Sequence, residues 1–456
     1  MQTQIFMVHK RHLGLRAPTV LAVGFALTIL VGALVLMLPV SAADGQITPF
    51  LDALFTAASA SCVTGLVTVS TAVHWSVFGK CVILLLIQIG GLGFMSVAAI
   101  ASFVLRRTIT LHERMVMSAG LNLSDGGGIV RLTRRVLFGT FIIEGTGAVL
   151  LSCRFVPHYG FPKGITMGVF HAVSAFCNAG FDLMGTPDDP FQSLIGWAED
   201  PLVNITLMAL IVLGGLGFFV WSDVWDKHSF CRLRLHTKIV LTATAGLLLF
   251  GFGWTLLFEW SNPATLGAFD TPHKLLAAAF ESVTLRTAGF NTIDLGALTG
   301  PSQAVSCLLM FIGGSPGSTA GGIKTVTAAV LVLTAISAFC GRTTVSAFGR
   351  TIAPRSIMNA VTLLRAGGLL CLVGACAIAG IEDAPFHQCL FEAVSAFGTV
   401  GVSMGLTPTL EAASRVILIV MMYMGRVGVL TLGVAVFMRR REPPRLKYPD
   451  ADVFIG

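Results

Sequence analysis

Four short segments of small residues, each ending in glycine, recur between long apolar stretches of the sequence. Their glycines stand 115, 109 and 112 residues apart, and each segment follows a short amphipathic run. The segments are Ser61–Gly65, Phe176–Gly180, Arg286–Gly289 and Gly398–Gly401. Self-similarity at one period indicates a repeated structural unit. The chain is therefore expected to fold as four copies of one unit.

The residue types in these segments indicate what the four copies form together. Glycine is the residue that turns its backbone carbonyl freely in either direction. Rings of backbone carbonyls replace the water shell of an alkali cation in selectivity filters. The pattern predicts four loops around one axis, as in a tetrameric cation channel with fused subunits. Helix packing is the competing interpretation, and it explains poorly why glycine recurs at one position of the unit.

The composition predicts a membrane protein. The chain has 456 residues, of which 54% are hydrophobic and only 12% are charged. Long runs almost free of charge are typical of transmembrane helices. They lie near 17–40, 82–104, 136–151, 202–221, 240–257, 304–339, 357–379 and 416–437. The first run exceeds the apolar core of a secretory signal, about 7–15 residues, so we expect it to be retained as a helix.

Charged residues divide between two sides if each repeat crosses the membrane twice. The formal net charge is +7, and the positive-inside rule makes the basic side cytoplasmic, with both termini there. The basic residues are Lys10, Arg11, Arg16, Arg106, Arg107, Arg114, Arg131, Arg134, Arg135, Lys227, Arg232, Arg234, Lys238, Arg342, Arg350, Arg355, Arg439, Arg440, Arg441, Arg445 and Lys447. Acidic residues on the other side are expected to attract cations. The short juxtamembrane clusters do not predict a nucleic-acid partner.

Each repeat is interpreted as an outer helix, a short re-entrant helix, a glycine-ended loop and an inner helix. The copies span 17–104, 132–226, 236–340 and 356–438, and a cytoplasmic tail follows at 439–456. The re-entrant helices are expected to begin near Phe50, Thr166, His273 and His387. About 12 residues are too few to cross a hydrocarbon core of about 30 Å. The expected fold is an all-α polytopic membrane protein with eight transmembrane spans around a pseudo-fourfold pore.

The third copy differs from the others in the spacing before its glycine. Phe280 precedes Gly289 by nine residues, whereas the corresponding phenylalanines, Phe55, Phe170 and Phe391, precede theirs by ten. Either the third loop is one residue tighter or its helix starts differently. Other glycines inside apolar runs are interpreted as helix-packing residues. They are Gly90, Gly91, Gly93, Gly214, Gly215 and Gly217.

Neither a zinc site nor a disulfide framework is predicted. The ten cysteines lack metal-type spacing and lie mostly in apolar runs, so they are expected to be small buried hydrophobic residues rather than disulfides or zinc ligands. His171, His273 and His387 recur near the re-entrant helices but on separate repeats. They are interpreted as polar residues at the membrane interface.

The loops, above all residues 284–292, resemble the potassium-uptake superfamily of Trk, Ktr and plant HKT transporters over nearly the whole chain. Within it, the sequence is most similar to the KtrB-type membrane subunits of bacterial Ktr systems. The resemblance implies transport of K⁺ into the cell across the bacterial cytoplasmic (inner) membrane, without enzymatic chemistry. It also implies a homodimer in membrane lipid, docked on a cytoplasmic ring of nucleotide-binding KtrA-type subunits. Na⁺ is a candidate activator, and no organic cofactor is expected on this chain.

The resemblance assigns the four loops to a selectivity filter in which backbone carbonyls bind K⁺. In the plant branch, serine at the first filter position goes with sodium permeation, so Gly65 favours potassium. The candidate filter residues are Val63, Thr64, Gly65, Asn178, Ala179, Gly180, Thr287, Ala288, Gly289, Thr399, Val400 and Gly401. Two alternatives stay open: a sodium-permeable member of the superfamily, and a K⁺ symporter coupled to Na⁺ or H⁺. The sequence does not determine whether transport is coupled.

A segment rich in glycine interrupts the apolar run of the third inner helix. Proline and glycine break a helix there, so the polar backbone must line a cavity or be buried in protein. The resemblance implies an intramembrane loop that gates the pore, and a packing kink is the alternative. The candidate gate residues are Gly313, Gly314, Ser315, Pro316, Gly317, Ser318, Thr319, Ala320, Gly321, Gly322, Lys324 and Arg426.

The same segment has a second interpretation, the phosphate-binding loop of a nucleotide hydrolase. Gly317 and Gly322 have the required separation, but Ile323 intrudes before Lys324 and no strand precedes the segment. A cation near the gate is the favoured role of Lys324.

Arg426 lies in the middle of the last apolar run. A charge at that depth normally faces the interior with a partner, and snorkelling to the interface is the alternative. Glu144 and Glu392 are candidate acidic partners. The resemblance places Arg426 beside the gating loop, where it holds the loop or sets an electrostatic barrier.

Overall fold

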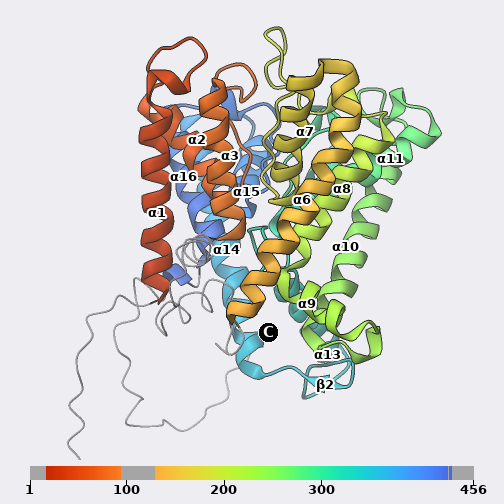
Figure 1. Cartoon of the computed structure of the whole chain (residues 1–456). Helices are drawn as coiled ribbons and strands as arrows, with labels where there is room; N and C mark the ends of the chain where they lie inside the picture. The colour runs from red at the N-terminus through yellow and green to blue at the C-terminus, as the bar shows by residue number, and fades with distance from the viewer. Residues whose placement is uncertain (1–16, 94–128, 430, 434–456) are drawn as a thin grey trace, which may run out of the picture.

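The computed structural model describes residues 17–93, 129–429 and 431–433. The predicted tail at 439–456, the end of the first inner helix and the basic residues near both termini lie outside these residues. The described part is predominantly helical with almost no strand, which confirms the all-α prediction (Figure 1). A two-stranded antiparallel hairpin joins β1 (Ser346–Ala347) to β2 (Arg350–Thr351).

Each repeat contributes one set of helices. The outer helices are α1 (Ala17–Leu36), α6 (Ile129–Tyr159), α10 (Leu235–Glu259) and α14 (Pro354–Ile381). The re-entrant helices are α2 (Phe50–Cys62), α7 (Phe161–Phe176), α11 (Thr271–Thr284) and α15 (Phe386–Gly398). The inner helices are α3 (Val77–Leu92), α8 (Pro201–Leu216) with α9 (Phe218–Lys227), α12 (Gly300–Phe311) with α13 (Thr325–Phe339), and α16 (Ala412–Val427). Short 3-10 helices occupy Pro39–Ser41, Ile195–Trp197, Phe230–Arg232, Leu266–Ala268, Leu295–Ala297 and Thr407–Thr409.

The repeats close into a ring. Each inner helix packs against the re-entrant helix of the next repeat: α3 against α7, α8 against α11, α12 against α15, and α16 against α2. The four phenylalanines of the predicted spacing pattern are all buried in one continuous core. The re-entrant helices therefore form the centre of the molecule.

The starts of the re-entrant helices agree with the sequence except in the second repeat. There α7 begins at Phe161, five residues before the predicted Thr166. Gly160, with a φ of 84°, turns the chain directly from α6 into α7, and Pro162 stands in the first turn, where its missing N–H costs nothing. The early start gives α7 a length of 16 residues.

Helix length does not confirm the predicted eight spans. In the described part of the chain, the four outer helices are long and apolar enough to cross a membrane. The pair α8 and α9 would add one more span, but its helices are bent by 92°. The number of spans stays a prediction.

Glycines in left-handed conformations end the described inner helices of the first, second and fourth repeats, which we did not predict. Gly93, Gly217 and Gly428 end α3, α8 and α16 with φ values of 80°, 94° and 91°. An L side chain rarely adopts these angles. At Gly93 an added Cβ would meet nothing within 4 Å, so the helix-packing interpretation was wrong there, whereas at Gly217 it would lie 2.8 Å from the Pro316 carbonyl oxygen. In the third repeat the break is longer and forms a loop over residues 312–324.

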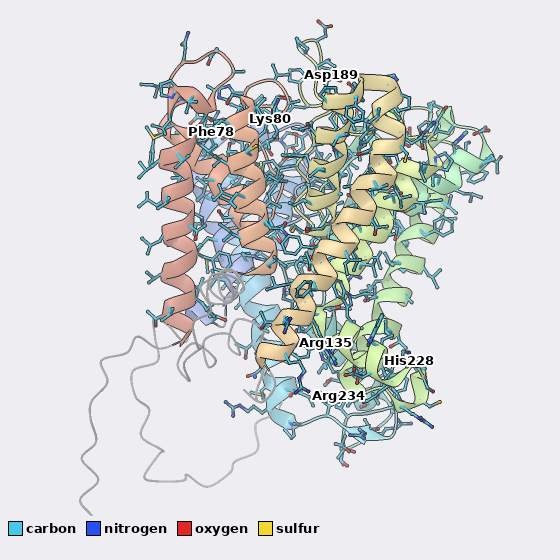
Figure 2. The ribbon with its side chains drawn as sticks, viewed as in Figure 1. Phe78, Lys80, Arg135, Asp189, His228 and Arg234 are labelled. Atoms are coloured by element: carbon cyan, nitrogen blue, oxygen red, sulfur yellow. The ribbon has the colours of Figure 1, made fainter. Side chains whose placement is uncertain are left out.

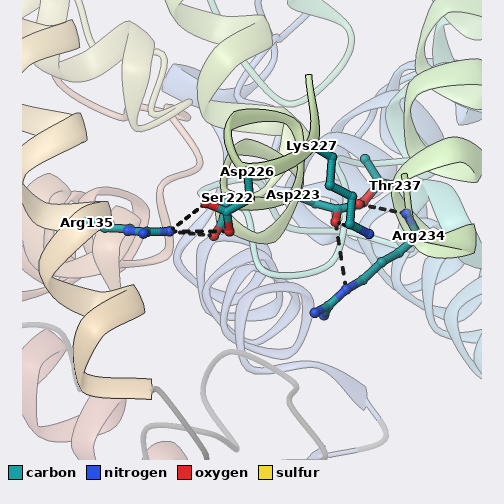
Figure 3. Close-up of polar contacts among 7 residues, drawn as sticks. All are labelled: Arg135, Ser222, Asp223, Asp226, Lys227, Arg234 and Thr237. Carbon is teal, nitrogen blue, oxygen red and sulfur yellow. Dashed lines mark hydrogen bonds and ion pairs between the residues drawn. The ribbon is translucent and has the colours of Figure 1, made fainter. Parts of the chain in front are cut away.

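Ion pairs and hydrogen bonds hold α9, which follows the break at Gly217 in the second repeat (Figure 3). Asp223 accepts hydrogen bonds from the backbone N–H of Arg234 at 2.8 Å and from the Thr237 hydroxyl at 2.7 Å, and it pairs with Lys227 at 2.9 Å. Asp226 pairs with Arg135 of α6 at 3.1 Å. Figure 2 shows Arg135 and Arg234 at the opposite end of the molecule from Asp189. This arrangement is consistent with the predicted separation of charge.

Candidate functional site

The four glycine loops have left-handed residues at the same two positions. In each, the residue two positions before the glycine is left-handed: Val63, Asn178, Thr287 and Thr399 have φ values of 57°, 58°, 68° and 52°. The glycines follow with φ values of 97°, 71°, 84° and 95° at Gly65, Gly180, Gly289 and Gly401. Four unequal sequences therefore share this left-handed pattern, and the cost of placing non-glycine residues in it indicates a constrained site.

The four glycines form a closed ring, which we call the glycine ring. A Cβ atom added to any of them would strike the carbonyl oxygen that precedes the next glycine in the ring. At Gly65 it would lie 2.5 Å from the Ala179 oxygen, and at Gly180 2.8 Å from the Ala288 oxygen. Gly289 meets the Val400 oxygen and Gly401 the Thr64 oxygen in the same way. The structure thus brings together backbone from all four predicted segments.

A hydroxyl at the end of each re-entrant helix supports its loop. Ser59 and Ser395 accept hydrogen bonds from the N–H groups of Gly65 and Gly401 at 3.0 and 3.1 Å. Ser174 donates to the carbonyl seven residues later, whereas Thr284 donates to the carbonyl six residues later. The third loop is one residue tighter, as one of the two sequence interpretations proposed.

A pocket of about 190 Å³ with a mixed polar and apolar lining adjoins the glycine ring. All four glycines line it, together with Asp182, Asp294 and the side-chain or backbone atoms of several Ser and Thr residues. A larger cavity of about 550 Å³ is lined by Pro316, Gly317, Lys324 and Arg426, among others, and by none of the four glycines.

The 312–324 loop packs against the broken second inner helix. The N–H groups of Ser315 and Thr319 donate to the carbonyls of Gly215 and Gly214 at 3.0 and 3.3 Å. The N–H of Phe218, the first residue of α9, donates to the Gly317 carbonyl at 2.9 Å. These bonds satisfy backbone groups that the breaks in both helices leave free.

Lys324 and Arg426 both bind carbonyl oxygens. The Lys324 ammonium donates to the Ala320 carbonyl at 2.7 Å, within its own loop. The Arg426 guanidinium donates to the carbonyls of Thr319 and Gly90 and, at 3.2 Å, to that of Gly91. It therefore joins the loop to the C-terminal end of α3, where the helix dipole favours a cation.

The prediction that Glu144 or Glu392 pairs with Arg426 was wrong. Glu144 accepts hydrogen bonds from the Gln88 amide at 3.1 and 3.2 Å, and Glu392 accepts them from the hydroxyls of Ser403 and Thr407. In the described part of the chain, the hydrogen-bond partners of Arg426 are the main-chain oxygens of Thr319, Gly90 and Gly91.

The three histidines do not share one environment. His171 is fully buried, with Nδ1 2.7 Å from the Met167 carbonyl and Nε2 3.3 Å from the N–H of Leu183. The interfacial interpretation was wrong for this residue. His273 is partly exposed beside Asp270, and His387 is exposed. Within residues 17–93 and 129–433, apart from 430, no cluster of metal-binding side chains is found.

Arg286 is the residue of the site that sequence reasoning missed. Its side chain is buried, and one terminal nitrogen donates to the Gly313 carbonyl at 2.9 Å and to the Thr325 hydroxyl at 2.8 Å. Gly313 and Thr325 stand at the two ends of the 312–324 loop. A buried charge beside a re-entrant helix is itself a signal of a functional residue, and it was available in the sequence.

An all-α chain whose four repeats bring glycine loops into one ring has the architecture of a cation-conducting membrane protein. The family model TrkH, described as a cation transport protein, matches residues 10–442. The chain therefore belongs to the TrkH family of cation transport proteins, and it is a transporter rather than an enzyme.

Relatives match over almost the full length. The chain is 42% identical to the Ktr system potassium uptake protein B of Bacillus subtilis over 439 residues, 96% of each chain. It is 40% identical to the potassium/sodium uptake protein NtpJ of Enterococcus hirae over 441 residues, again 96% of each. The crystal structure of the potassium transporter TrkH from Vibrio parahaemolyticus covers 94% of this chain and 86% of its own, with a TM-score of 0.72 and 17% identity. This likeness confirms the fold with four repeats.

Proposed function

We propose that the chain takes up K⁺ across a bacterial inner membrane through the glycine ring, which acts as a carbonyl-lined selectivity filter. The observation that carries the proposal is the closed contact of the four loops, in which each left-handed glycine lies against the carbonyl oxygen that precedes the next glycine. Carbonyl rings of this kind replace the hydration shell of an alkali cation. The proposed filter residues are the twelve named from the sequence, and the potassium-uptake names of the relatives support the choice of ion.

A change at Gly65 tests the filter. Gly65→Ser places a Cβ beside the Ala179 carbonyl, at a φ of 97°, so it should lower the ratio of rubidium to sodium flux into liposomes. Ser306→Ala in α12, outside the ring, is the matched control and should leave the ratio unchanged. An unchanged ratio in Gly65→Ser would contradict the filter assignment.

A second candidate function is a transporter with substantial sodium permeation or ion coupling, which the name potassium/sodium uptake protein of one relative favours. Equal rubidium and sodium fluxes in the wild type would select sodium permeation. Coupled symport requires a fixed stoichiometry of cotransported Na⁺ or H⁺, whereas a channel-like path follows the potassium gradient alone.

The 312–324 loop and Arg426 are the proposed gate. The loop is held by hydrogen bonds to α8, α9 and Arg426, and it lines the larger cavity rather than the pocket that adjoins the ring. Deleting residues 317–322 should therefore raise conduction several-fold in the same liposome assay. An unaltered flux would favour the packing kink.

Regulation is proposed to come from a cytoplasmic KtrA-type ring that binds nucleotide and docks on a homodimer of this chain, with both termini cytoplasmic. The support is the name of the Ktr system to which the relatives belong. Liposomes with the chain alone and with such a partner should differ in flux when nucleotide is added. Nucleotide binding to the isolated chain would instead support the nucleotide-hydrolase alternative.

We also propose that Na⁺ activates transport. The test is to measure rubidium flux into liposomes with and without added Na⁺ at a constant K⁺ concentration.

A further inference from the structure

The 312–324 loop is hydrogen-bonded to two of the glycine loops by side chains. The Thr319 hydroxyl donates to the Asn178 amide oxygen at 2.8 Å, and it lies 3.2 Å from the Phe176 carbonyl. Asn178 is the left-handed residue of the second glycine loop, two positions before Gly180. The middle of the 312–324 loop thus touches the second glycine loop directly.

The ends of the 312–324 loop are tied to the third glycine loop. Arg286 immediately precedes Thr287, the left-handed residue of that loop, and its guanidinium binds both the Gly313 carbonyl and the Thr325 hydroxyl. The Thr325 hydroxyl in turn donates to the Gly313 carbonyl at 3.0 Å. The backbone bridge between Ile312 and Ile323 lies between these ends. Arg286 therefore fastens the loop where it leaves α12 and enters α13.

The backbone of Thr319 makes a second set of contacts, with residues other than Asn178. Its carbonyl accepts from Arg426 and its N–H donates to Gly214. A displacement of the loop that breaks these bonds must also pull on Asn178, because one residue carries all of them. Thr319, Asn178 and Gly214 are buried and Arg426 is partly buried, and an unpaired polar group in such a place is costly.

We propose that Asn178 and Arg286 are positioning residues that couple the second and third glycine loops to the 312–324 loop, so that displacing this loop lowers ion selectivity as well as opening the path. The inference rests on the proposed function. It adds that gating and selection share hydrogen bonds and are not independent.

The first test is a double-mutant cycle on the ratio of rubidium to sodium flux into liposomes containing the full chain. Thr319→Val removes the hydroxyl and keeps the shape of the side chain. Asn178→Gly removes the amide and tolerates the left-handed φ of 58°. Each single variant should lower the ratio by about two- to tenfold, the range that one buried hydrogen bond supplies. The double variant should lower it no further than the single variants do.

Thr334→Val is the control for the cycle, because its hydroxyl donates to the Val330 carbonyl within α13, at 2.7 Å, outside the 312–324 loop and the glycine loops. It should leave the selectivity ratio unchanged, whatever its total flux. Additive effects of Thr319→Val and Asn178→Gly, or an unchanged ratio in both, would overturn the coupling while leaving the filter and gate intact. A wild type without rubidium preference would instead remove the function on which the coupling rests.

The second test concerns Arg286. Arg286→Gln and the milder Thr325→Val should both lower the selectivity ratio, and Arg286→Lys should restore part of it, because the ammonium still donates to the Gly313 carbonyl. A purely structural role predicts reduced folded protein in all three variants with the ratio unchanged in the protein that folds. That outcome would overturn the assignment of Arg286.

Discussion

One register position of the re-entrant helices carries a buried polar side chain in every repeat. It lies three residues before the hydroxyl that supports each glycine loop, and the four residues are Thr56, His171, Glu281 and Glu392. His171 and Glu392 contact the segments that follow their glycines, through Leu183 and Thr407. Glu281 differs, because both of its carboxylate oxygens are buried without a hydrogen-bond partner among the described residues. The position therefore contacts the segment after the glycine in the second and fourth repeats, whereas the side-chain oxygens of Thr56 and Glu281 have no hydrogen-bond partner among the described residues.

Glu281→Gln and Glu392→Gln should change stability in opposite directions. An unpartnered buried carboxylate is costly, so the neutral amide at position 281 should keep or raise the thermal stability of the chain in detergent. At position 392 the carboxylate accepts hydrogen bonds on both oxygens, and its loss should cost about 1–3 kcal/mol. The measurement is the melting temperature of both variants in one detergent; a larger decrease for Glu281→Gln contradicts the reasoning.

Sequence reasoning reached some residues of the site and not others. The four ring glycines could be predicted, because they recur at one position of a repeat whose period can be measured directly in the sequence. The partners of Arg426 could not, because they are main-chain carbonyls of Gly90, Gly91 and Thr319, and every residue carries such a group. Burial of a charge predicts that a partner exists, but it does not tell which backbone atom is free.

At the scale of helices, the inner elements of the second, third and fourth repeats are interrupted within the described residues, and the interruption is longest in the third. Hydropathy predicted single spans there, because apolar letters continue past Gly93, Gly217 and Gly428. The breaks depend on left-handed φ angles, which hydropathy does not register. By contrast, Gly90 and Gly214 do approach backbone closely, against the Ser61 and Phe176 carbonyls, so their packing interpretation is confirmed.

The position of α9 after its break depends on Asp223. This carboxylate is largely buried and binds the start of α10 through Arg234 and Thr237. Asp223→Ala leaves these donors unpaired and should destabilise the chain by about 1–3 kcal/mol. Because Phe218 of α9 holds the 312–324 loop, conduction should rise as well.

Asp226→Ala is the control for this prediction. Its ion pair with Arg135 is half exposed, with 52% of each side chain accessible, and exposed pairs contribute about 0–1 kcal/mol. Denaturant unfolding in detergent and liposome flux measure both variants. Equal effects of the two substitutions would mean that burial of Asp223 does not anchor α9.

The whole molecule is a ring made from one chain, so its first and last repeats must meet without a covalent link. They do so where α16 packs against α2. At that seam Arg415 of α16 binds Asp52 of α2 at 2.7 Å, and Asp52 also accepts a hydrogen bond from the Thr68 hydroxyl at 2.9 Å. The two side chains of the ion pair are 21% and 16% exposed, which places the pair between a surface and a buried salt bridge.

Closure of the ring should therefore depend measurably on this pair. Asp52→Asn and Arg415→Gln should each cost about 1–2 kcal/mol, between the values for exposed and buried pairs, and the double variant should cost less than their sum. Because α2 leads directly into the first glycine loop, the single variants should also broaden ion selectivity, which a contact at an arbitrary surface would not do. Unfolding in detergent and the ratio of rubidium to sodium flux test the two parts separately. Strict additivity would show that the seam is held by helix packing alone.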